Sequence, residues 1–384
     1  MLGTAVIALG VNLVLWGLTM ILTIHYTRLG NISRRQNTPG RSNTALPSVA
    51  VVIVAQEEAE ELRRHLPVFL KQKYPAEFQV IVVDIHSTDD TLKLLEKLEE
   101  EYPQLAHSSI PSSARYISKQ RLAMMLGIKT AFTEWVVFTK ADCCPESEEW
   151  LTSFMQAARQ GKEAVIGLTR YAQRDSMLMQ KRQFLRLWRQ MLWIPFAQNH
   201  HPYKAEDTLL AYRKEYFFSH HGFESDSKRL VGAAALLVNK NISNRQCAIS
   251  VSPEAMLIQD NPLPYTWLQE RVFDVDIYKH AAHKFLYISW YTLRILLPLL
   301  YTLSTIAACI LWLDNSIVLV TIGALWLSVG IVRDIAFNRT VRQFNMKAYH
   351  LLLPYLCSAV VVWEIHAWAK WRITSKKAFR KKFV

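Results

Sequence analysis

Two short, uninterrupted apolar runs set the predicted fold. Residues 49–54 and 78–84 are rich in valine and isoleucine, and such continuous runs are typical of strands buried on both faces of a parallel sheet. Residues 57–72 follow the first run with apolar residues at helical spacing, and residues 91–101 follow the second in the same way. This alternation of strand and helix predicts a doubly wound α/β sheet with right-handed crossovers.

The pattern is less regular in the middle of the chain. We predict helices at residues 116–131 and 150–160, and strands at residues 164–169, 247–251 and near Met256. Residues 180–196 form a basic, aromatic helix with two open interpretations. Either this helix lies against a bilayer, or its Trp188, Leu192 and Trp193 belong to the core.

Three uncharged stretches are long enough to cross a membrane as helices. They are residues 2–24, 295–313 and 316–332. The last two are separated by Asp314 and Asn315 and therefore predict a membrane hairpin. A fourth apolar stretch, residues 351–363, is shorter and contains Pro354.

Basic residues give these segments a predicted orientation. Arginines follow the first span at once, and the positive-inside rule then places residue 42 onward in the cytosol. A fourth crossing would put the basic C-terminal tail outside, so we expect a re-entrant or interfacial segment there. Asn12 within the first span is expected to make a helix-packing contact.

These observations divide the chain into five predicted parts of a protein of the inner (cytoplasmic) membrane. They are an N-terminal transmembrane helix (1–27), a linker (28–48), a cytosolic α/β domain (49–285), a transmembrane hairpin (286–333), and an interfacial or re-entrant segment with a basic cytosolic tail (334–384).

Composition supports a membrane setting. The chain has 51% hydrophobic residues and a net charge of +13. Because the basic residues gather beside apolar runs, the charge favours an anionic membrane surface over nucleic acid. The five cysteines lack zinc-ligand spacing, which indicates a reduced cytosolic face.

One stretch places an acid where α/β enzymes carry their chemistry. The β-forming residues 135–139 predict a strand that ends near Asp142, before the turn at Pro145. Ligands of open α/β sheets bind outside the carboxyl ends of the strands. Lys140 lies two residues earlier on the same strand face.

Four segments between about residues 49 and 280 resemble the family 2 glycosyltransferases, which have the GT-A nucleotide-sugar fold. Residues 51–58 are similar to the first strand and its acidic loop, and residues 82–91 to Val-Asp-Asp-Gly-Ser-Thr-Asp-Asp-Thr. Residues 119–142 resemble the helix and strand that end in Asp-X-Asp, and residues 211–223 the acceptor side of a membrane-bound subgroup.

The resemblance implies roles for individual residues. It assigns the donor nucleotide to Glu58 and Asp84, although Asp84 is alternatively a turn cap that uses Ser87 and Thr88. Asp89 is expected to cap the helix that opens at Thr91. The family's last acid of Asp-X-Asp binds a divalent metal, Mn or Mg, that neutralises the leaving diphosphate; here that acid is Asp142.

Three departures from the family pattern affect the chemistry. Lys140 replaces the first acid of Asp-X-Asp; it would repel a divalent metal, and it could itself pair with a diphosphate. Ala233, Ala234 and Ala235 occupy positions where the related subgroup has consecutive acids, one of which would take the acceptor's proton.

The third departure lies in residues 269–273, which resemble Gln-X-X-Arg-Trp with Val272 and Phe273 in place of Arg-Trp. Gln269 survives as the expected diphosphate contact. Glu224 and Asp226 are the acids nearest to the alanine run, and we interpret them as solvated loop residues.

Two functions follow from the resemblance and its departures. The first is a membrane-bound glycosyltransferase that moves a sugar from a nucleotide-sugar donor to a lipid-linked or cell-envelope glycan acceptor. The second is a catalytically impaired relative that acts as a scaffold or partner of another glycosyltransferase. A membrane-anchored protein that binds anionic lipid is a weaker third interpretation.

Overall fold

The structure is a computed structural model that describes residues 2–36, 45–112, 118–158, 161–173, 176–199, 202, 205, 208–223, 233–262 and 264–374. The chain forms two compact units. One contains Met1–Arg35 and Phe285–Ile365, and the other contains Gln36–Lys284 and His366–Val384.

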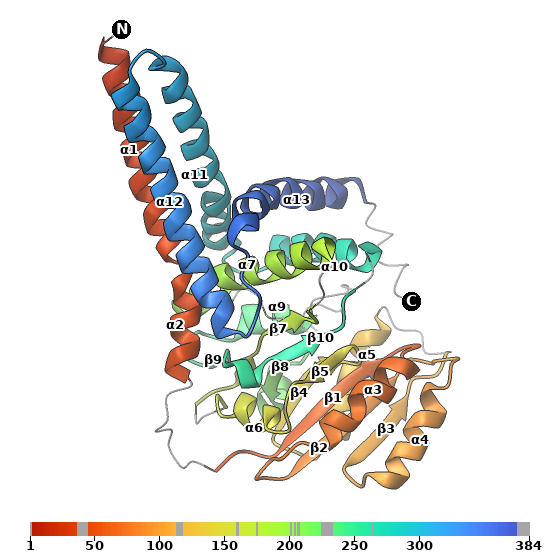
Figure 1. Ribbon diagram of the computed structural model, residues 1–384. Coiled ribbons are helices and arrows are strands. Elements are labelled where there is room, and N and C mark those ends of the chain that lie inside the picture. Colours follow the sequence, from red (N-terminus) through yellow and green to blue (C-terminus); the bar gives the residue numbers. More distant parts are fainter. Residues whose placement is uncertain are drawn as a thin grey trace. The chain divides into compact units, whose positions relative to one another are not determined.

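A seven-stranded sheet organises the second unit, in the order β3-β2-β1-β4-β8-β6-β9 among the described residues (Figure 1). Its strands are β1 (Val49–Ala55), β2 (Phe78–Asp84), β3 (Leu105–Ser109), β4 (Trp135–Lys140), β6 (Ala164–Ile166), β8 (Leu210–Arg213) and β9 (Cys247–Ile249). Strands β3, β2, β1 and β4 are parallel, and β8 runs antiparallel to both of its neighbours. The predicted α/β fold is confirmed.

Three strands, β3, β8 and Cys143–Pro145, were not predicted, and one predicted strand is divided. Strand β3 lies at the sheet edge and buries only Leu105 fully, so it lacks a continuous apolar run. The predicted strand at 164–169 is split into β6 and β7 (Thr169–Tyr171), which belong to different sheets. Gly167 lies between them, and its N–H donates to the Leu209 carbonyl at 3.0 Å.

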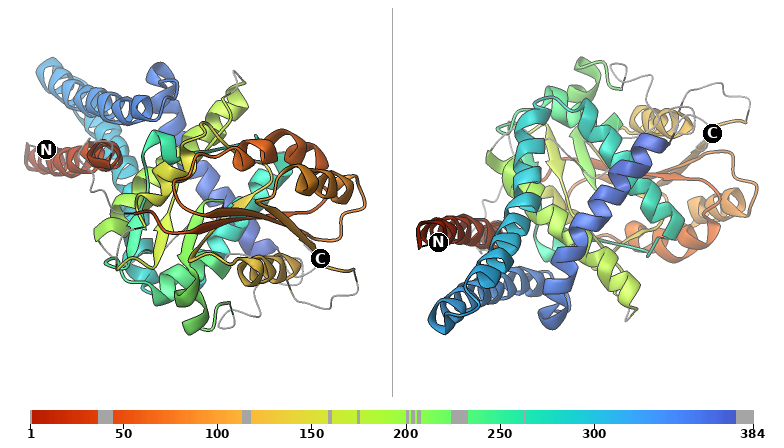
Figure 2. Two further views of the ribbon diagram at one scale, coloured as in Figure 1. Left: turned by 90° about the horizontal axis from the view of Figure 1, so that it is seen from below. Right: turned by 90° about the horizontal axis from the view of Figure 1, so that it is seen from above.

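Alternate residues of the central strands pack against helices on opposite faces (Figure 2). Val51 and Ile53 of β1 share a core with residues of α3 (Ala59–Leu70) and α4 (Thr91–Glu101). Val52 points to the other face, toward α5 (Lys119–Thr130). A Cβ atom at Gly127 of α5 would lie 2.4 Å from Val52 Cγ1, so the missing side chain permits this close approach.

A smaller three-stranded sheet adjoins these elements, with the order β5-β10-β7. It contains β5 (Cys143–Pro145), β7 and β10 (Leu257–Gln259). The unit also contains α6 (Trp150–Met155), α7 (Met177–Asn199), α8 (Lys214–Ser219), α9 (Ala233–Asn241), a short 3-10 helix (Pro253–Ala255) and α10 (Pro264–His280).

Helix α7 belongs to the core. Trp188, Leu192 and Trp193 are all buried, which decides between the two interpretations left open by the sequence. Its buried Arg189 donates to Asp274 Oδ2 of α10 at 2.6 Å. Arg189, one of the basic residues of this helix, thus pairs with an acid inside the protein.

The first unit is helical, and its helices α1, α11 and α12 lie side by side (Figure 1). Its helices are α1 (Leu2–Ile24), α2 (Thr27–Gln36), α11 (Lys284–Leu311), α12 (Ser316–Gln343), a short 3-10 helix (His350–Leu352) and α13 (Leu353–Ile373), which continues into the other unit. The segment predicted as a linker therefore begins with a helix. Asn12 donates to Ser304 Oγ at 3.0 Å and to Thr305 Oγ1 at 3.2 Å, which confirms the predicted helix-packing contact.

Four helical segments are long and apolar enough to cross a membrane: Val6–Arg34, Lys284–Leu311, Ser316–Gln343 and His350–Ile373. The last contains the stretch expected to be re-entrant or interfacial, and that expectation stays a prediction.

Candidate functional site

The carboxyl ends of three parallel strands meet at one edge of the main sheet. Ala55 of β1 is in register with Asp84 of β2, and Val54 of β1 is in register with Lys140 of β4. The loops that leave these strands must therefore lie beside one another. They carry the acids Glu58, Asp84 and Asp142 predicted from the sequence.

The loops after β1 and β2 are bound to each other by hydrogen bonds. Thr88 N donates to Glu57 Oε1 at 2.7 Å, and Glu57 N donates to Ser87 Oγ at 2.8 Å. Both loops contain a non-glycine residue in the left-handed region, Glu57 with φ 56° and His86 with φ 50°. Such a conformation costs roughly 1 to 2 kcal/mol per residue. The hydrogen bonds between the two loops offset part of this cost.

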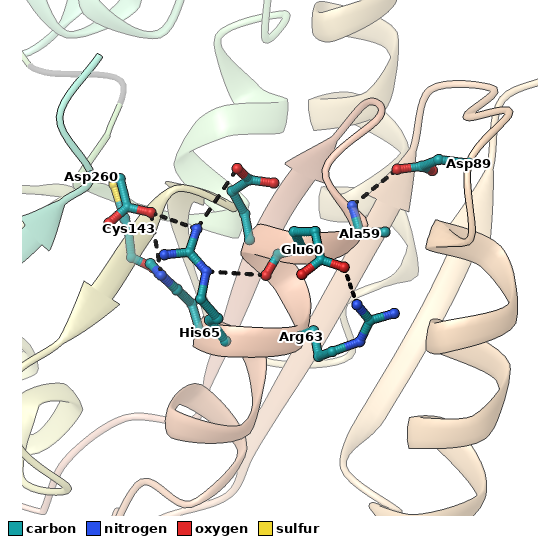
Figure 3. A network of polar contacts seen from close by, with 9 residues as sticks. Ala59, Glu60, Arg63, His65, Asp89, Cys143 and Asp260 are labelled. Atoms are coloured by element: carbon teal, nitrogen blue, oxygen red, sulfur yellow. Dashed lines mark hydrogen bonds and ion pairs between the residues drawn. The ribbon is translucent and has the colours of Figure 1, made fainter. Parts of the chain in front are cut away.

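Asp89 joins the same network from its position before α4. Its Oδ1 accepts from Thr91 N at 3.1 Å, in agreement with the predicted cap. Its Oδ2 accepts from Ala59 N at 3.1 Å, at the first residue of α3 (Figure 3). One carboxylate thus fixes the starts of two helices.

Asp84 is fully buried, with 0% of its surface exposed. Its Oδ1 accepts from Ser87 Oγ at 2.5 Å, and its Oδ2 accepts from Ser87 N at 3.1 Å and Ser109 Oγ at 3.2 Å. These bonds match the turn-cap alternative for Asp84. The carboxylate thus holds the loop after β2 in place.

Glu58 and Asp142 influence each other electrostatically. Burial, followed by the negative charge of Asp142, raises the pKa of Glu58 to about 7. The Gln56 N–H, which donates to Glu58 Oε2 at 3.2 Å, and the charge of Lys140 act in the opposite direction. Each of the two negative carboxylates, partly removed from water, disfavours the ionised form of the other.

Asp142 is held from the side of the smaller sheet. Gln259 Nε2, at the end of β10, donates to Asp142 Oδ2 at 2.8 Å, and Asp260 N donates to the Asp142 carbonyl at 2.8 Å. Because a carboxylate only accepts hydrogen bonds, the Gln259 nitrogen must face it. Gln259 is 1% exposed and Asp142 is partly exposed, so this bond is shielded from water on the side of Gln259.

A second group of contacts supports Asp260 and ties helix α3 to this edge (Figure 3). Arg64 Nη2 lies 3.0 Å and His65 Nε2 3.5 Å from Asp260 Oδ2. His65 Nδ1 lies 3.3 Å from the Cys143 carbonyl. Burial lowers the pKa of His65 below its ordinary value, which favours the neutral ring at pH 7.

Helix α10 brings a further acid to Lys140. Burial raises the pKa of Glu270, while the positive charges of Lys140 and Arg186 lower it. Tyr171 Oη donates to Glu270 Oε2 at 3.5 Å. Arg186 lies over the Tyr171 ring, 3.8 Å from its centroid. Lys140 is therefore within electrostatic reach of Glu58, in the loop after β1, and of Glu270 on α10.

The positions implied for acceptor chemistry lie on two helices. Ala233, Ala234 and Ala235 form the first turn of α9, and Ala235 is buried. Gln269 lies on α10 directly before Glu270. The alternative acids Glu224 and Asp226 lie outside the described residues.

Among the described residues, the acids at this edge do not form a cation site of their own. In the part of the chain that the structure describes, no group of three or more His, Cys, Asp or Glu side chains could hold a metal ion. Lys140 opposes one, because a divalent cation about 6 Å from an ammonium is repelled by roughly 5 kcal/mol at an effective dielectric constant of about 20.

The structure gathers Glu58, Lys140 and Asp142 at one sheet edge and adds residues that sequence reasoning missed. Glu270 lies in the segment that resembles Gln-X-X-Arg-Trp, and an acidic residue there was the signal that could have identified it from the sequence. Gln259 gave no signal, because it reaches Asp142 only through the pairing of β10 with β5.

Comparisons with known proteins agree with this fold. Residues 50–223 match the family described as Glycosyl transferase family 2. The mannosyltransferase PcManGT from Pyrobaculum calidifontis, solved in complex with GDP-Man and Mn2+, is similar with a TM-score of 0.53 and 18% identity over 91% of this chain and 99% of that one.

A second solved structure, S. aureus TarS 1-349 in complex with UDP-GlcNAc, has a TM-score of 0.42 and 16% identity over 85% of this chain and 91% of that one. A search of curated proteins finds no match. Residues 50–223 thus match the family 2 glycosyltransferase model, and the domain that contains them has the GT-A fold.

Proposed function

We propose that the protein is a membrane-bound glycosyltransferase that moves a sugar from a nucleotide-sugar donor to a lipid-linked or cell-envelope glycan acceptor. One observation carries the proposal: within a family 2 domain, Glu58, Lys140 and Asp142 converge at the carboxyl edge of β1 and β4. This is the edge at which open α/β sheets bind ligands.

We propose that the nucleotide-sugar donor binds at this edge. Glu58 contacts the nucleoside part of the donor, while Asp84 keeps the β2 loop in shape through Ser87 and Ser109. Lys140 and Gln269 face the diphosphate. We assign no step to a divalent metal.

The acceptor hydroxyl needs a base as it attacks the anomeric carbon. Alanines 233–235 cannot accept a proton. We assign this role to Glu270, which is partly buried on α10 near Lys140 and Asp142. Burial raises the pKa of Glu270 above its ordinary value, which makes its carboxylate a stronger base.

The membrane segments indicate where we propose that the reaction takes place. Four helices have the length and composition of membrane spans, and basic residues follow the first of them. We propose an inner-membrane protein with its glycosyltransferase domain in the cytosol. A lipid-linked acceptor would then reach the domain from the bilayer.

Turnover of nucleotide sugars tests the proposal. The full chain in lipid nanodiscs is incubated with UDP- and GDP-sugars and a membrane lipid extract, and the released nucleotide is measured. We expect at least one donor to be consumed, and Glu270→Gln to lower kcat by about 100-fold or more, in the range of a general base. Glu96→Gln, at an exposed acid of α4, is the matched control and should retain activity.

A second function is favoured by the alanines on the first turn of α9. In that case the chain is a scaffold or partner of an active glycosyltransferase. No turnover with any donor, together with a nucleotide that still raises the melting temperature Tm, would support the scaffold and contradict the enzyme.

A further inference from the structure

We propose that the donor's diphosphate is held by fixed cationic side chains, with Lys140 as the principal one, so that nucleotide binding needs no divalent cation. This inference rests on the proposed donor site. It concerns the chemistry by which that site recognises a nucleoside diphosphate.

The position of Lys140 is the first argument. It is the last residue of β4 and pairs in register with Val54 of β1. The chain then turns through Ala141 to Asp142, so the ammonium group and the carboxylate leave the same strand end. Lys140 is partly buried there, which limits the freedom of its long side chain.

The second argument is the charge around Lys140. Its positive charge opposes the rise in the pKa of Glu58, which lies in the loop between β1 and α3, and of Glu270 on α10. The ammonium group is therefore within electrostatic reach of acids on two separate elements. Arg186 supplies a second positive charge near Glu270. A diphosphate that entered this space would meet two cations already present in the protein.

The third argument is the state of Asp142. Gln259 Nε2 donates to its Oδ2 at 2.8 Å, and Gln259 is itself nearly fully buried. This charge-assisted bond is of the strong kind. This contact orients one oxygen of the carboxylate, and with lysine at position 140 Asp142 is the one acid left of the two Asp-X-Asp positions.

Lysine also suits this role chemically. Its compact ammonium group binds phosphate as a point charge with three donors. Arginine retains the positive charge at the same place, whereas methionine keeps the side-chain length without charge. Aspartate restores the acid that a metal-binding site would use. These three substitutions separate charge, size and metal recruitment.

Binding of UDP and GDP to the full chain in detergent micelles tests the inference. Titration calorimetry is run once with EDTA and once with MnCl2. For the natural chain, we expect one of the nucleotides to bind in EDTA with an affinity that Mn2+ changes by less than threefold. Lys140→Met should weaken this binding at least tenfold, and Lys140→Arg should largely preserve it.

Lys140→Asp provides the reverse test. We expect this variant to bind the nucleotide at least tenfold more tightly with Mn2+ than with EDTA. The Tm of each variant without nucleotide, compared with that of Lys140→Arg, separates misfolding from a loss of binding.

Two negative results have different meanings. Nucleotide binding by the natural chain that disappears in EDTA overturns the metal-free site and leaves the proposed function intact. An absence of UDP and GDP binding under both conditions overturns both proposals.

Discussion

Replacing Glu58 by glutamine tests the electrostatics of the strand edge. The pKa of Glu58 rises from an ordinary 4.5 to about 7, because burial and the charge of Asp142 disfavour the ionised form. Between these two values the folded protein keeps a proton that the unfolded chain releases. The free energy of unfolding therefore falls as pH rises through this window and levels off above pH 7.

The magnitude follows from the same pKa. One pKa unit corresponds to about 1.4 kcal/mol, so the interval from 4.5 to about 7 corresponds to at most about 3 kcal/mol. Part of this interval is already passed at pH 5, and Glu58 is partly exposed. We expect about 2 kcal/mol between pH 5 and pH 8, after a discount for solvent screening.

Differential scanning fluorimetry in detergent measures this effect. Glu58→Gln removes the titrating group. The Tm of this variant minus the Tm of the natural chain should therefore be roughly 4 to 8 °C more positive at pH 8 than at pH 5, given about 2 to 4 °C per kcal/mol for a domain of this size. Glu96→Gln controls for the loss of one negative charge. A difference that is equal at the two pH values, or larger at pH 5, would refute the reasoning.

Two further substitutions test the packing and the polar contacts behind the site. Gly127→Ala should lower the free energy of unfolding by about 1 to 2 kcal/mol, because the added methyl group meets Val52 at 2.4 Å. The double variant with Val52→Ala should lower Tm by less than the sum of the two single changes. Gln259→Glu should lower Tm more at pH 8 than at pH 5, because the new carboxylate would face Asp142 in place of an N–H donor. An equal loss at both pH values would show that the contact with Asp142 does not govern this position.

Much of the α/β domain could be predicted because its signals are local. The buried strands β1 and β2 are continuous apolar runs, and α4 has the predicted bounds Thr91–Glu101. Edge strand β3 has no such run, since its outer residues remain partly exposed. The division between β6 and β7 depends on pairing with distant partners, to which local periodicity is insensitive.

The site was predictable only where it follows from strand order. Parallel strands bring their carboxyl ends together, which was enough to place Glu58 and Asp142 at one edge. Glu270 and Gln259 reach the same place by tertiary packing of α10 and β10. The hydrogen bonds of Asp84 depend on Ser109, 25 residues away on β3, so sequence alone left its role open.

Hydrogen–deuterium exchange with and without UDP or GDP tests the location of the donor site most directly. The account predicts nucleotide-dependent protection of peptides that contain residues 55–58, 84–90 and 140–142, with unchanged exchange in α11 as an internal control. Protection confined to other segments, or none while a nucleotide binds, would contradict a donor pocket at the carboxyl edge of β1, β2 and β4.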